Sequence, residues 1–358
     1  MLPSPAVWPF LLLHLGVCAA VAVVLVRRLA RRAVLGRAIA AVAIVTCVGL
    51  ALGFTTAPRP GSYAFAVLLA WSWTLGLVLP SMLAITGVVL LRRSRRSGWV
   101  FVIGSSLVVA AAIEAFAIEP TQLEVNHHVV HSDRIDTPLR IAVIADLQTD
   151  SPGEHERAAL RAVMAAEPDV IVFPGDLIQT SDLDRYRAEW SVLREMIDEV
   201  GLAAPLGIWV VQGDVELPDV WLRELPTEFI VLDGSVRLRD DVDLSGLDLR
   251  RSARAEALSR PSDDRLHVVM GHRPDFALGS VDADLLLAGH THGGQVQLPF
   301  FGPLVTLSRV PRAWAAGRTE TDDDTTLIVS RGVGMERGLA PRLRFLCRPE
   351  ILLIDVQP

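Results

Sequence analysis

The chain has 358 residues and a formal net charge of −7, and 51% of its residues are hydrophobic. Ten arginines and two acidic residues lie in the first 120 residues, a balance of +8, which leaves −15 for the remainder. This acidic remainder excludes nucleic acid as a partner, because phosphate backbones are bound by clustered positive charge. The sequence has no lysine, which excludes a phosphate-binding P-loop, and its three scattered cysteines exclude a disulfide framework or a thiolate metal site.

Four apolar runs occupy the first part of the chain, over residues 7–26, 33–54, 65–91 and 99–118. Each is close to the ~20 apolar residues that a membrane-spanning helix needs. The first run also suits a cleaved signal peptide, but no basic residue precedes it and three further runs follow. We therefore predict a transmembrane domain of four helices over residues 1–120 and a second domain over residues 121–358.

The loops between the apolar runs differ in charge. The segments RRLARRAVLGR and LRRSRRSG are rich in arginine, whereas TTAPRPGSY contains only Arg59. Cytoplasmic loops carry an excess of basic residues, so the two arginine-rich loops are predicted to face the cytoplasm and both ends of the bundle to lie outside. The sequence thus predicts a multi-pass protein of the cell membrane whose second domain is extracytoplasmic.

From residue 139 onward, short apolar runs alternate with helical patterns. The runs LRIAVIAD, DVIVFPGD and GIWVVQGD each end in an acidic residue, namely Asp146, Asp176 and Asp214. Such alternation is typical of an α/β domain with buried parallel strands. Ligands of open α/β sheets gather outside the carboxyl ends of the strands, so the three carboxylates are expected to converge on one crevice.

Two later apolar runs end in histidine. RLHVVMGH ends at His272, and DADLLLAGH ends at His290, with His292 two residues further on. Residues i and i+2 share a face of a strand, and the flanking glycines permit a tight turn. The triplet HTH alone is more typical of a polar loop, but five strand-end side chains in order favour a metal site made of carboxylates and imidazoles.

These motifs resemble those of the calcineurin-like metallophosphoesterase superfamily, whose order is D-x-H, G-D-x-x-D, G-N-H-[DE], a lone His and G-H-x-H. In this chain they read DLQ, GDLIQ, GDVE, GHRPD and GHTHGGQ. The resemblance covers residues 139–355, and the tail VSRGVGMERG…LRFLCRPEILLI is similar to the bacterial membrane-associated envelope branch of phosphodiesterases, some of which act on lipids. The fold that it implies is α/β: an N-terminal four-helix transmembrane bundle followed by an α/β/β/α metallophosphoesterase sandwich.

The resemblance also implies the ligands of two divalent metal ions. One ion is held by Asp146, Gln148, Asp176 and His292. The other is held by Asp176, Asp214, His272 and His290, so that Asp176 bridges the pair. These oxygen and nitrogen donors favour Mn²⁺, with Fe, Zn²⁺ and Mg²⁺ as alternatives.

The chain departs from the superfamily pattern at three positions. Gln148 replaces a histidine, which exchanges an imidazole nitrogen for an amide oxygen, and Asp214 replaces an asparagine, which adds a negative charge. Val215 stands where the superfamily has its catalytic histidine, so the catalytic residue is unknown. Exposed strand or linker positions are predicted for His127, His128 and His131.

The function that this pattern predicts is hydrolysis of a phosphomonoester or phosphodiester by a metal-activated water, on a substrate such as a lipid or an envelope-linked compound. A pair of metal ions can activate water and stabilise both oxygens of an in-line displacement. The alternative is a catalytically degenerate domain that binds metal or a phosphorylated ligand and signals through the membrane helices. A transporter is disfavoured because the helices carry few charges, and the oligomeric state is left open.

Overall fold

The computed structural model of the chain describes residues 8–31, 35–56, 63–321 and 325–358. Internal contacts divide the chain into a helical unit (Met1–Ile118 with Glu336–Arg342) and a sandwich unit (Glu119–Met335 with Leu343–Pro358). The predicted domain boundary at residue 120 remains a prediction, because compactness alone does not define a membrane domain.

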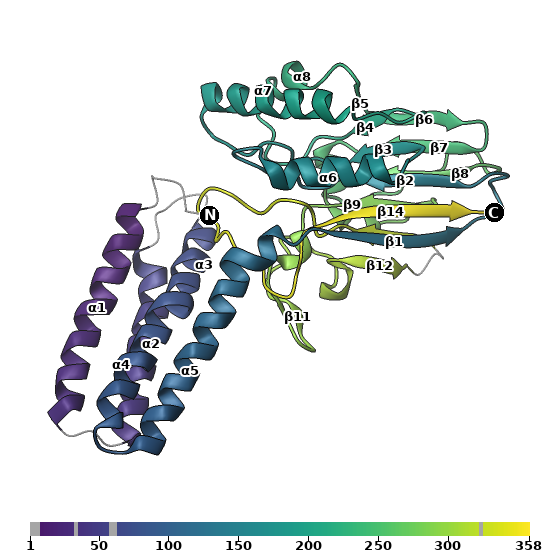
Figure 1. Ribbon diagram of the computed structural model, residues 1–358. Helices are drawn as coiled ribbons and strands as arrows, with labels where there is room; N and C mark the ends of the chain where they lie inside the picture. Colours follow the sequence, from purple (N-terminus) through teal and green to yellow (C-terminus); the bar gives the residue numbers. More distant parts are fainter. Residues whose placement is uncertain (1–7, 32–34, 57–62, 322–324) are drawn as a thin grey trace. The chain divides into compact units, whose positions relative to one another are not determined.

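Helices make up the helical unit (Figure 1). They are α1 (Trp8–Arg31), α2 (Leu35–Thr56), α3 (Tyr63–Trp73), α4 (Leu79–Leu91) and α5 (Arg95–Ile113), with π-helical turns at Thr74–Val78 and Glu114–Ile118. Four stretches are long and apolar enough to cross a membrane: Trp8–Arg28, Leu35–Phe54, Tyr63–Leu91 and Arg95–Thr121. The predicted number of long apolar helices is therefore confirmed for the described residues. The predicted starts at Val7 and Ala33 lie outside those residues, and the fourth helix begins at Arg95 rather than at Trp99.

The third apolar stretch is interrupted by its π-helical turn. Pro80 follows that turn and has no backbone N–H, so it cannot donate to the carbonyl one turn earlier, and a wider turn accommodates the defect. Thr74, the first residue of the turn, is fully buried, and its hydroxyl lies 2.9 Å from Nε2 of His14 on α1. The interruption is thus tied by a polar contact to the neighbouring helix.

The first sheet of the sandwich unit has the strand order β1-β14-β2-β3-β4-β5. The strands are β1 (Glu124–His131), β2 (Leu139–Val143), β3 (Val170–Phe173), β4 (Ile208–Val210), β5 (Phe229–Val231) and β14 (Glu350–Gln357). Strands β2 to β5 are parallel, whereas β14 pairs antiparallel with β2 and parallel with β1. The end of the chain is therefore inserted between the first two strands of the unit (Figure 1).

The second sheet has the order β12-β13-β9-β8-β7-β6. Its strands are β6 (Gly234–Arg239), β7 (Val242–Gly246), β8 (Leu266–Met270), β9 (Leu285–Ala288), β12 (Gly317–Glu320) and β13 (Thr326–Val329). The four central strands are parallel, and the two edge strands β6 and β12 are antiparallel to their neighbours. Parallel neighbours bring their carboxyl ends to one edge, which matters for the site below.

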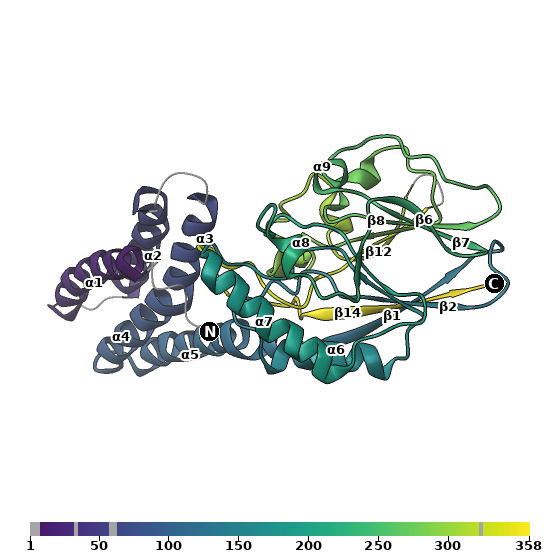
Figure 2. The same cartoon turned by 90° about the horizontal axis from the view of Figure 1, so that it is seen from above.

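The two sheets pack face to face, and the alternation of strand side chains builds two cores. In β2, Ile141 and Val143 face the second sheet, whereas Ala142 faces the helices α6 (Glu154–Ala165) and α7 (Leu183–Val200). Figure 2 shows these helices on the outer face of the first sheet and the second sheet on its other face. The outer face of the second sheet is covered by short helical segments, α9 (Leu249–Ser252) and Pro274–Leu278. The predicted α/β/β/α sandwich is confirmed.

Candidate metal centre

The predicted metal ligands follow the carboxyl ends of five strands. Asp146 follows β2, Asp176 follows β3 and Asp214 follows β4 in the first sheet. His272 follows β8 and His290 follows β9 in the second sheet, and His292 lies one turn further along. Because the sheets face each other, their strand ends deliver carboxylates from one side and imidazoles from the other.

Two clusters of side chains with metal-ligating atoms result, and together they contain six of the seven predicted ligands. The first cluster is Asp214, His272 and His290, and the second is Asp146, Asp176 and His292. Within each cluster the ligating atoms lie within 4.8 Å of one another. These two clusters are the groups of three or more histidine, cysteine or acidic side chains with this spacing that the described residues contain. A binuclear centre would need two neighbouring clusters of this kind.

Contacts of His272 connect the two clusters. Its Nε2 lies 3.5 Å from Oδ2 of Asp176 and 3.9 Å from Oδ1 of Asp214, and its Nδ1 lies 3.9 Å from Oδ1 of Asp146. His290 Nδ1 lies 3.3 Å from Oδ2 of Asp214. Asp176 thus lies at the junction of the clusters, at the position for which the family resemblance implies a bridging ligand.

Both rings of the first cluster direct an acceptor nitrogen into the site. Nδ1 of His272 lies 2.8 Å from the carbonyl oxygen of Pro174, and Nε2 of His290 lies 3.0 Å from the carbonyl oxygen of Leu307, so these nitrogens must donate. In neutral rings the remaining nitrogens are acceptors, and they lie 3.2 Å from each other beside the carboxylate of Asp214. Such a group of acceptors is stabilised by a cation, and carbonyl partners of this kind orient metal-binding histidines.

The pKa values favour the neutral form of these rings. Burial, and next the ring of His290, lower the pKa of His272 to about 3. Burial also lowers the pKa of His290. A ligand must be deprotonated to bind a metal ion, so both rings are in the form that binds.

Negative charge is crowded at the carboxylates. Burial raises the pKa of Asp176 well above its ordinary value, and the neighbouring carboxylates of Glu216, Asp214 and Asp146 raise it further. Divalent cations would supply the positive charge that this part of the site lacks. Oxygen and nitrogen donors without a thiolate suit Mn²⁺, Fe, Zn²⁺ or Mg²⁺, so the donor set fits a pair of divalent ions.

The backbone at the candidate ligands is strained. Positive φ angles occur at Asp146 (46°), Gln148 (32°), Asp176 (58°), His290 (69°) and His292 (48°). Only a few per cent of residues other than glycine adopt such angles, yet five of the seven predicted ligands do. Strain of this kind, on the order of 1–3 kcal/mol per residue, clusters at active sites and ligand-binding sites. The loops are therefore shaped to aim these side chains.

Two departures from the superfamily pattern are visible in the geometry. The fully buried Gln148 donates its backbone N–H to the carbonyl oxygen of Asp176 at 2.8 Å, and its side-chain amide donates to Gln179 at 3.1 Å. Val215 donates its backbone N–H to Oδ1 of Asp176 at 3.1 Å, but its side chain brings no proton donor. The loop thus contacts Asp176 through its backbone, without an imidazole. The three histidines predicted to be exposed lie on β1, outside both clusters: His127 and His131 are exposed, whereas the prediction is wrong for His128, which is half-buried because its side chain lies on the other face of the strand.

Two residues that the sequence analysis did not assign hold the site together. Arg273 donates to Oδ2 of Asp214 at 2.6 Å. Glu216 is buried and accepts from the backbone N–H groups of Leu177 at 2.8 Å and Gly213 at 2.7 Å, so it clamps the loops after β3 and β4 together. Both residues stand inside the motifs GHRPD and GDVE, but a motif does not reveal which side chain its neighbour contacts.

The C-terminal tail supports the first ligand loop. Arg344 is fully buried, and its guanidinium donates to the carbonyl oxygens of Arg331 at 2.7 Å and Gly332 at 3.0 Å. A side chain at Gly332 would collide with Asp146, and the next glycine, Gly334, donates its N–H to the carbonyl oxygen of Asp146 at 2.7 Å. The tail is therefore part of the wall that positions Asp146.

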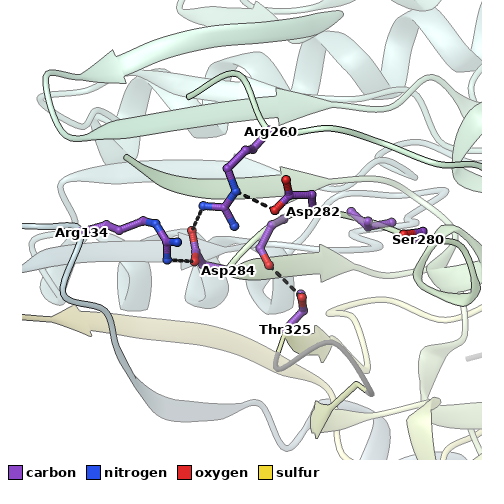
Figure 3. A pocket seen from close by; sticks show the side chains of 8 residues that line it. Arg134, Arg260, Ser280, Asp282, Asp284 and Thr325 are labelled. Carbon is purple, nitrogen blue, oxygen red and sulfur yellow. Dashed lines mark hydrogen bonds and ion pairs between the residues drawn. The ribbon is translucent and has the colours of Figure 1, made fainter. Parts of the chain in front are cut away.

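A separate pocket of about 430 Å³ lies at the opposite edge of the second sheet (Figure 3). It is lined by Asp284, which immediately precedes β9, and by Asp282, Arg134 and Arg260. Arg134 pairs with Asp284 at 2.8 Å, and Arg260 pairs with Asp282 at 2.6 Å. These charges neutralise one another, so the pocket has no excess charge with which to attract an ionic ligand.

Comparisons with known proteins agree with this geometry. A family model described as calcineurin-like phosphoesterase matches residues 139–294. An uncharacterized metallophosphoesterase of Bacillus subtilis, YkuE, is 30% identical over 67% of this chain and 87% of its own length. The phosphodiesterase YaeI of Escherichia coli is 34% identical over 25% of this chain and 32% of its own length. A bovine protein named for a transmembrane region with a metallophosphoesterase domain is 28% identical over 62% of this chain and 54% of its own length.

Proposed function

The chain belongs to the calcineurin-like phosphoesterase family, and on this premise we propose that it is a membrane-anchored, metal-dependent hydrolase of phosphodiesters or phosphomonoesters. The observation that carries the proposal is the buried cluster in which acceptor nitrogens of His272 and His290 meet beside Asp214. The four apolar stretches would hold this domain at a membrane, which supports a lipid or envelope-linked substrate. The Escherichia coli relative that is named a phosphodiesterase supports that branch of the family.

In this proposal, the ligands are those predicted from the sequence. Asp146, Gln148, Asp176 and His292 hold one ion, and Asp176, Asp214, His272 and His290 hold the other. Two bound divalent ions, with Mn²⁺ as our first expectation, would lower the pKa of a water molecule and neutralise charge on the phosphoryl oxygens. The protein keeps both imidazoles neutral through burial and fixes their tautomers through the carbonyls of Pro174 and Leu307.

The absence of an imidazole at Val215 leaves open the alternative of a domain that binds a phosphorylated ligand without turning it over. Two observations favour an enzyme. The loop that carries Val215 donates a backbone hydrogen bond to Asp176, and the backbones of five candidate ligands have strained conformations. A strained backbone costs free energy, and strain of this kind is typical of residues that take part in binding or catalysis.

The orientation in the membrane is also proposed. The arginine-rich loops support cytoplasmic placement of those loops and extracytoplasmic placement of the sandwich unit. A protease added to intact cells should then degrade the sandwich unit. Protection in intact cells and degradation only after lysis would reverse the assignment.

The decisive experiment measures hydrolysis and metal content on the full-length protein in detergent. Bis-p-nitrophenyl phosphate and p-nitrophenyl phosphate are the substrates, with Mn²⁺ added. We expect His290→Ala to lose nearly all hydrolysis and one bound ion by elemental analysis, because it removes a ligand of the metal pair. His131→Ala, an exposed histidine on β1, is the matched control and should behave like the wild type. Two bound ions with no turnover of either ester would favour the ligand-binding alternative.

A further inference from the structure

A hairpin with an exposed apolar tip follows the last predicted ligand. It consists of β10 (Gln297–Leu298), a connecting turn and β11 (Gly302–Pro303), and it projects from the sandwich (Figure 1). Phe300 at the tip is fully exposed, and Phe301, Leu298 and Leu304 are also exposed. Phe300 has a φ of 66°, an angle that is an outlier for a bulky residue. A group of large apolar side chains at a strained, exposed tip indicates contact with an apolar partner.

The base of this hairpin forms part of the candidate metal centre. The hairpin begins five residues after His292, and Leu307, four residues beyond β11, accepts the hydrogen bond from His290. A side chain at Gly294 would collide with Pro303 and with the carbonyl oxygen of Val305, so the two sides of the base are closely packed. A partner that touches the tip therefore contacts a segment whose base supports the candidate ligand His290.

Hydrogen bonds inside the sandwich unit connect the hairpin base to Glu119, near the end of the last apolar stretch. Gln297 donates its N–H to the carbonyl oxygen of Phe345 at 2.9 Å. The next residue, Leu346, donates its N–H to the buried carboxylate of Glu119 at 2.8 Å. Glu119 follows the π-helical turn Glu114–Ile118 and lies within the apolar stretch Arg95–Thr121. Within the sandwich unit, the hairpin base is therefore linked to the first residue of that unit, which directly follows the last apolar helix along the chain.

Cationic side chains accompany the exposed aromatic rings. The guanidinium of Arg312 lies 4.4 Å from the ring centroid of Phe301. Arg309, three residues before Arg312, is 65% exposed but pairs with Asp275, so the positive charge beside the rings comes from Arg312. Aromatic and aliphatic side chains next to arginines are typical of segments that lie at the surface of an anionic bilayer.

We propose that the tip of this hairpin, made of Leu298, Phe300, Phe301 and Leu304, inserts into the surface of the bilayer that holds the apolar helices. It brings the metal centre to the phosphoester headgroup of a lipid. The substrate class that follows is an amphipathic phosphoester whose chain stays in the bilayer. The inference rests on the proposed function for its substrate, whereas the insertion itself can be measured without catalysis.

The insertion is tested with an environment-sensitive probe on the full-length protein in nanodiscs that contain phosphatidylcholine and phosphatidylglycerol. In a Cys47→Ala background, Phe300→Cys carries a nitrobenzoxadiazole label, and Asp264→Cys is the matched control. Asp264 is exposed and precedes β8, so it lies at the edge of the sheet opposite to the site. We expect blue-shifted emission and quenching by brominated lipid at position 300 and neither at position 264. Equal, water-like emission at both positions would overturn the proposal.

Delivery of a lipid is tested with two esters that share one leaving group, hexadecyl p-nitrophenyl phosphate in the bilayer and methyl p-nitrophenyl phosphate in water. Phe300→Ser with Phe301→Ser should lower kcat/KM for the hexadecyl ester by about tenfold or more, since apolar anchoring is lost, and leave the methyl ester unchanged. The control is Val192→Ser, an exposed apolar residue on α7. Equal losses on both esters would overturn delivery by the hairpin. Insertion of the probe without hydrolysis of either ester would uphold the membrane contact and reject the proposed function.

Discussion

Replacing Arg273 by glutamine should strengthen metal binding and weaken phosphate binding at the same time. The guanidinium of Arg273 lies 2.6 Å from Oδ2 of Asp214, and both side chains are about a third exposed, at 32% and 27%. Although burial alone would raise it, the pKa of Asp214 is lowered by the rings of His272 and His290 and by Arg273. This cation repels a divalent ion and attracts a phosphoryl group, so its removal has opposite consequences for the two ligands.

The size of the expected change in affinity follows from the charges involved and from the exposure of the Arg273–Asp214 pair to solvent. Two unit charges 4 Å apart interact by about 4 kcal/mol at an effective dielectric constant of about 20. Solvent screens a pair that is one-third exposed, which brings the expected effect down to about 1 kcal/mol. That energy corresponds to a dissociation constant for Mn²⁺ that is roughly fivefold lower in Arg273→Gln and an inhibition constant for phosphate that is roughly fivefold higher.

The assay is titration of Mn²⁺ against a competing chelator, followed by inhibition by inorganic phosphate, both on the full-length protein. Arg254→Gln removes an exposed arginine that pairs with Glu256, outside the predicted ligand set, and is the matched control. Asp214→Asn should weaken metal binding by itself and should leave most of the effect of Arg273→Gln in place, because the cation repels the divalent ion whether or not the carboxylate is present. If Arg273→Gln weakens metal binding and leaves phosphate inhibition unchanged, the guanidinium only orients Asp214, and our electrostatic reasoning is wrong.

Three further outcomes are expected. Val215→His should accelerate the hydrolysis of alkyl esters relative to aryl esters, by up to the roughly 10²–10⁴-fold that general acid catalysis contributes. If the ratio of kcat/KM for alkyl esters to kcat/KM for aryl esters is unchanged, the ring does not reach the leaving oxygen. Burial raises the pKa of Glu216 from 4.5 to about 7, so the chelated protein should lose stability as pH rises across that range, and Glu216→Gln should flatten the dependence of melting temperature on pH. Gly213→Ala would place a methyl group against the carboxylate of Asp176 and should abolish metal binding. The control is Gly201→Ala, whose methyl group meets open space at a φ of 67°; it should cost about 1 kcal/mol of stability and keep the metal content. Normal metal content in Gly213→Ala would contradict the assigned geometry.

The candidate ligands could be predicted from the sequence because they follow the carboxyl ends of apolar strands. Asp146 and Asp176 each follow an apolar run, and parallel strands bring such positions to one edge whatever the details of the loops. The apolar helices were accessible for a similar reason, since length and composition decide them. Both features depend on short-range patterns in the chain.

The rest depends on contacts between distant segments, which have no short-range pattern. The pairing of Arg273 with Asp214 joins residues from different sheets, and the buried Arg344 supports a loop that touches Asp146. The π-helical turn at Thr74–Val78 interrupts a stretch that reads as one uniform apolar run. The hairpin after His292 carries its phenylalanines outward, although apolar residues are usually expected in a core.

The missing imidazole at Val215 and the guanidinium of Arg273 bear on the same step of the proposed reaction. Val215 offers no proton, and a guanidinium does not release one in proteins, so neither residue can protonate a leaving oxygen. Arg273 is, however, the cation that contacts the exposed member of the first cluster, Asp214, and it can bind a phosphoryl oxygen with its remaining N–H groups. The site is therefore equipped to bind anionic charge and poorly equipped to assist a basic leaving group. Such a site suits a phosphoester whose leaving oxygen is stabilised by other means. A lipid held at the bilayer surface by the hairpin would add the advantage of position, which does not depend on the basicity of the leaving group.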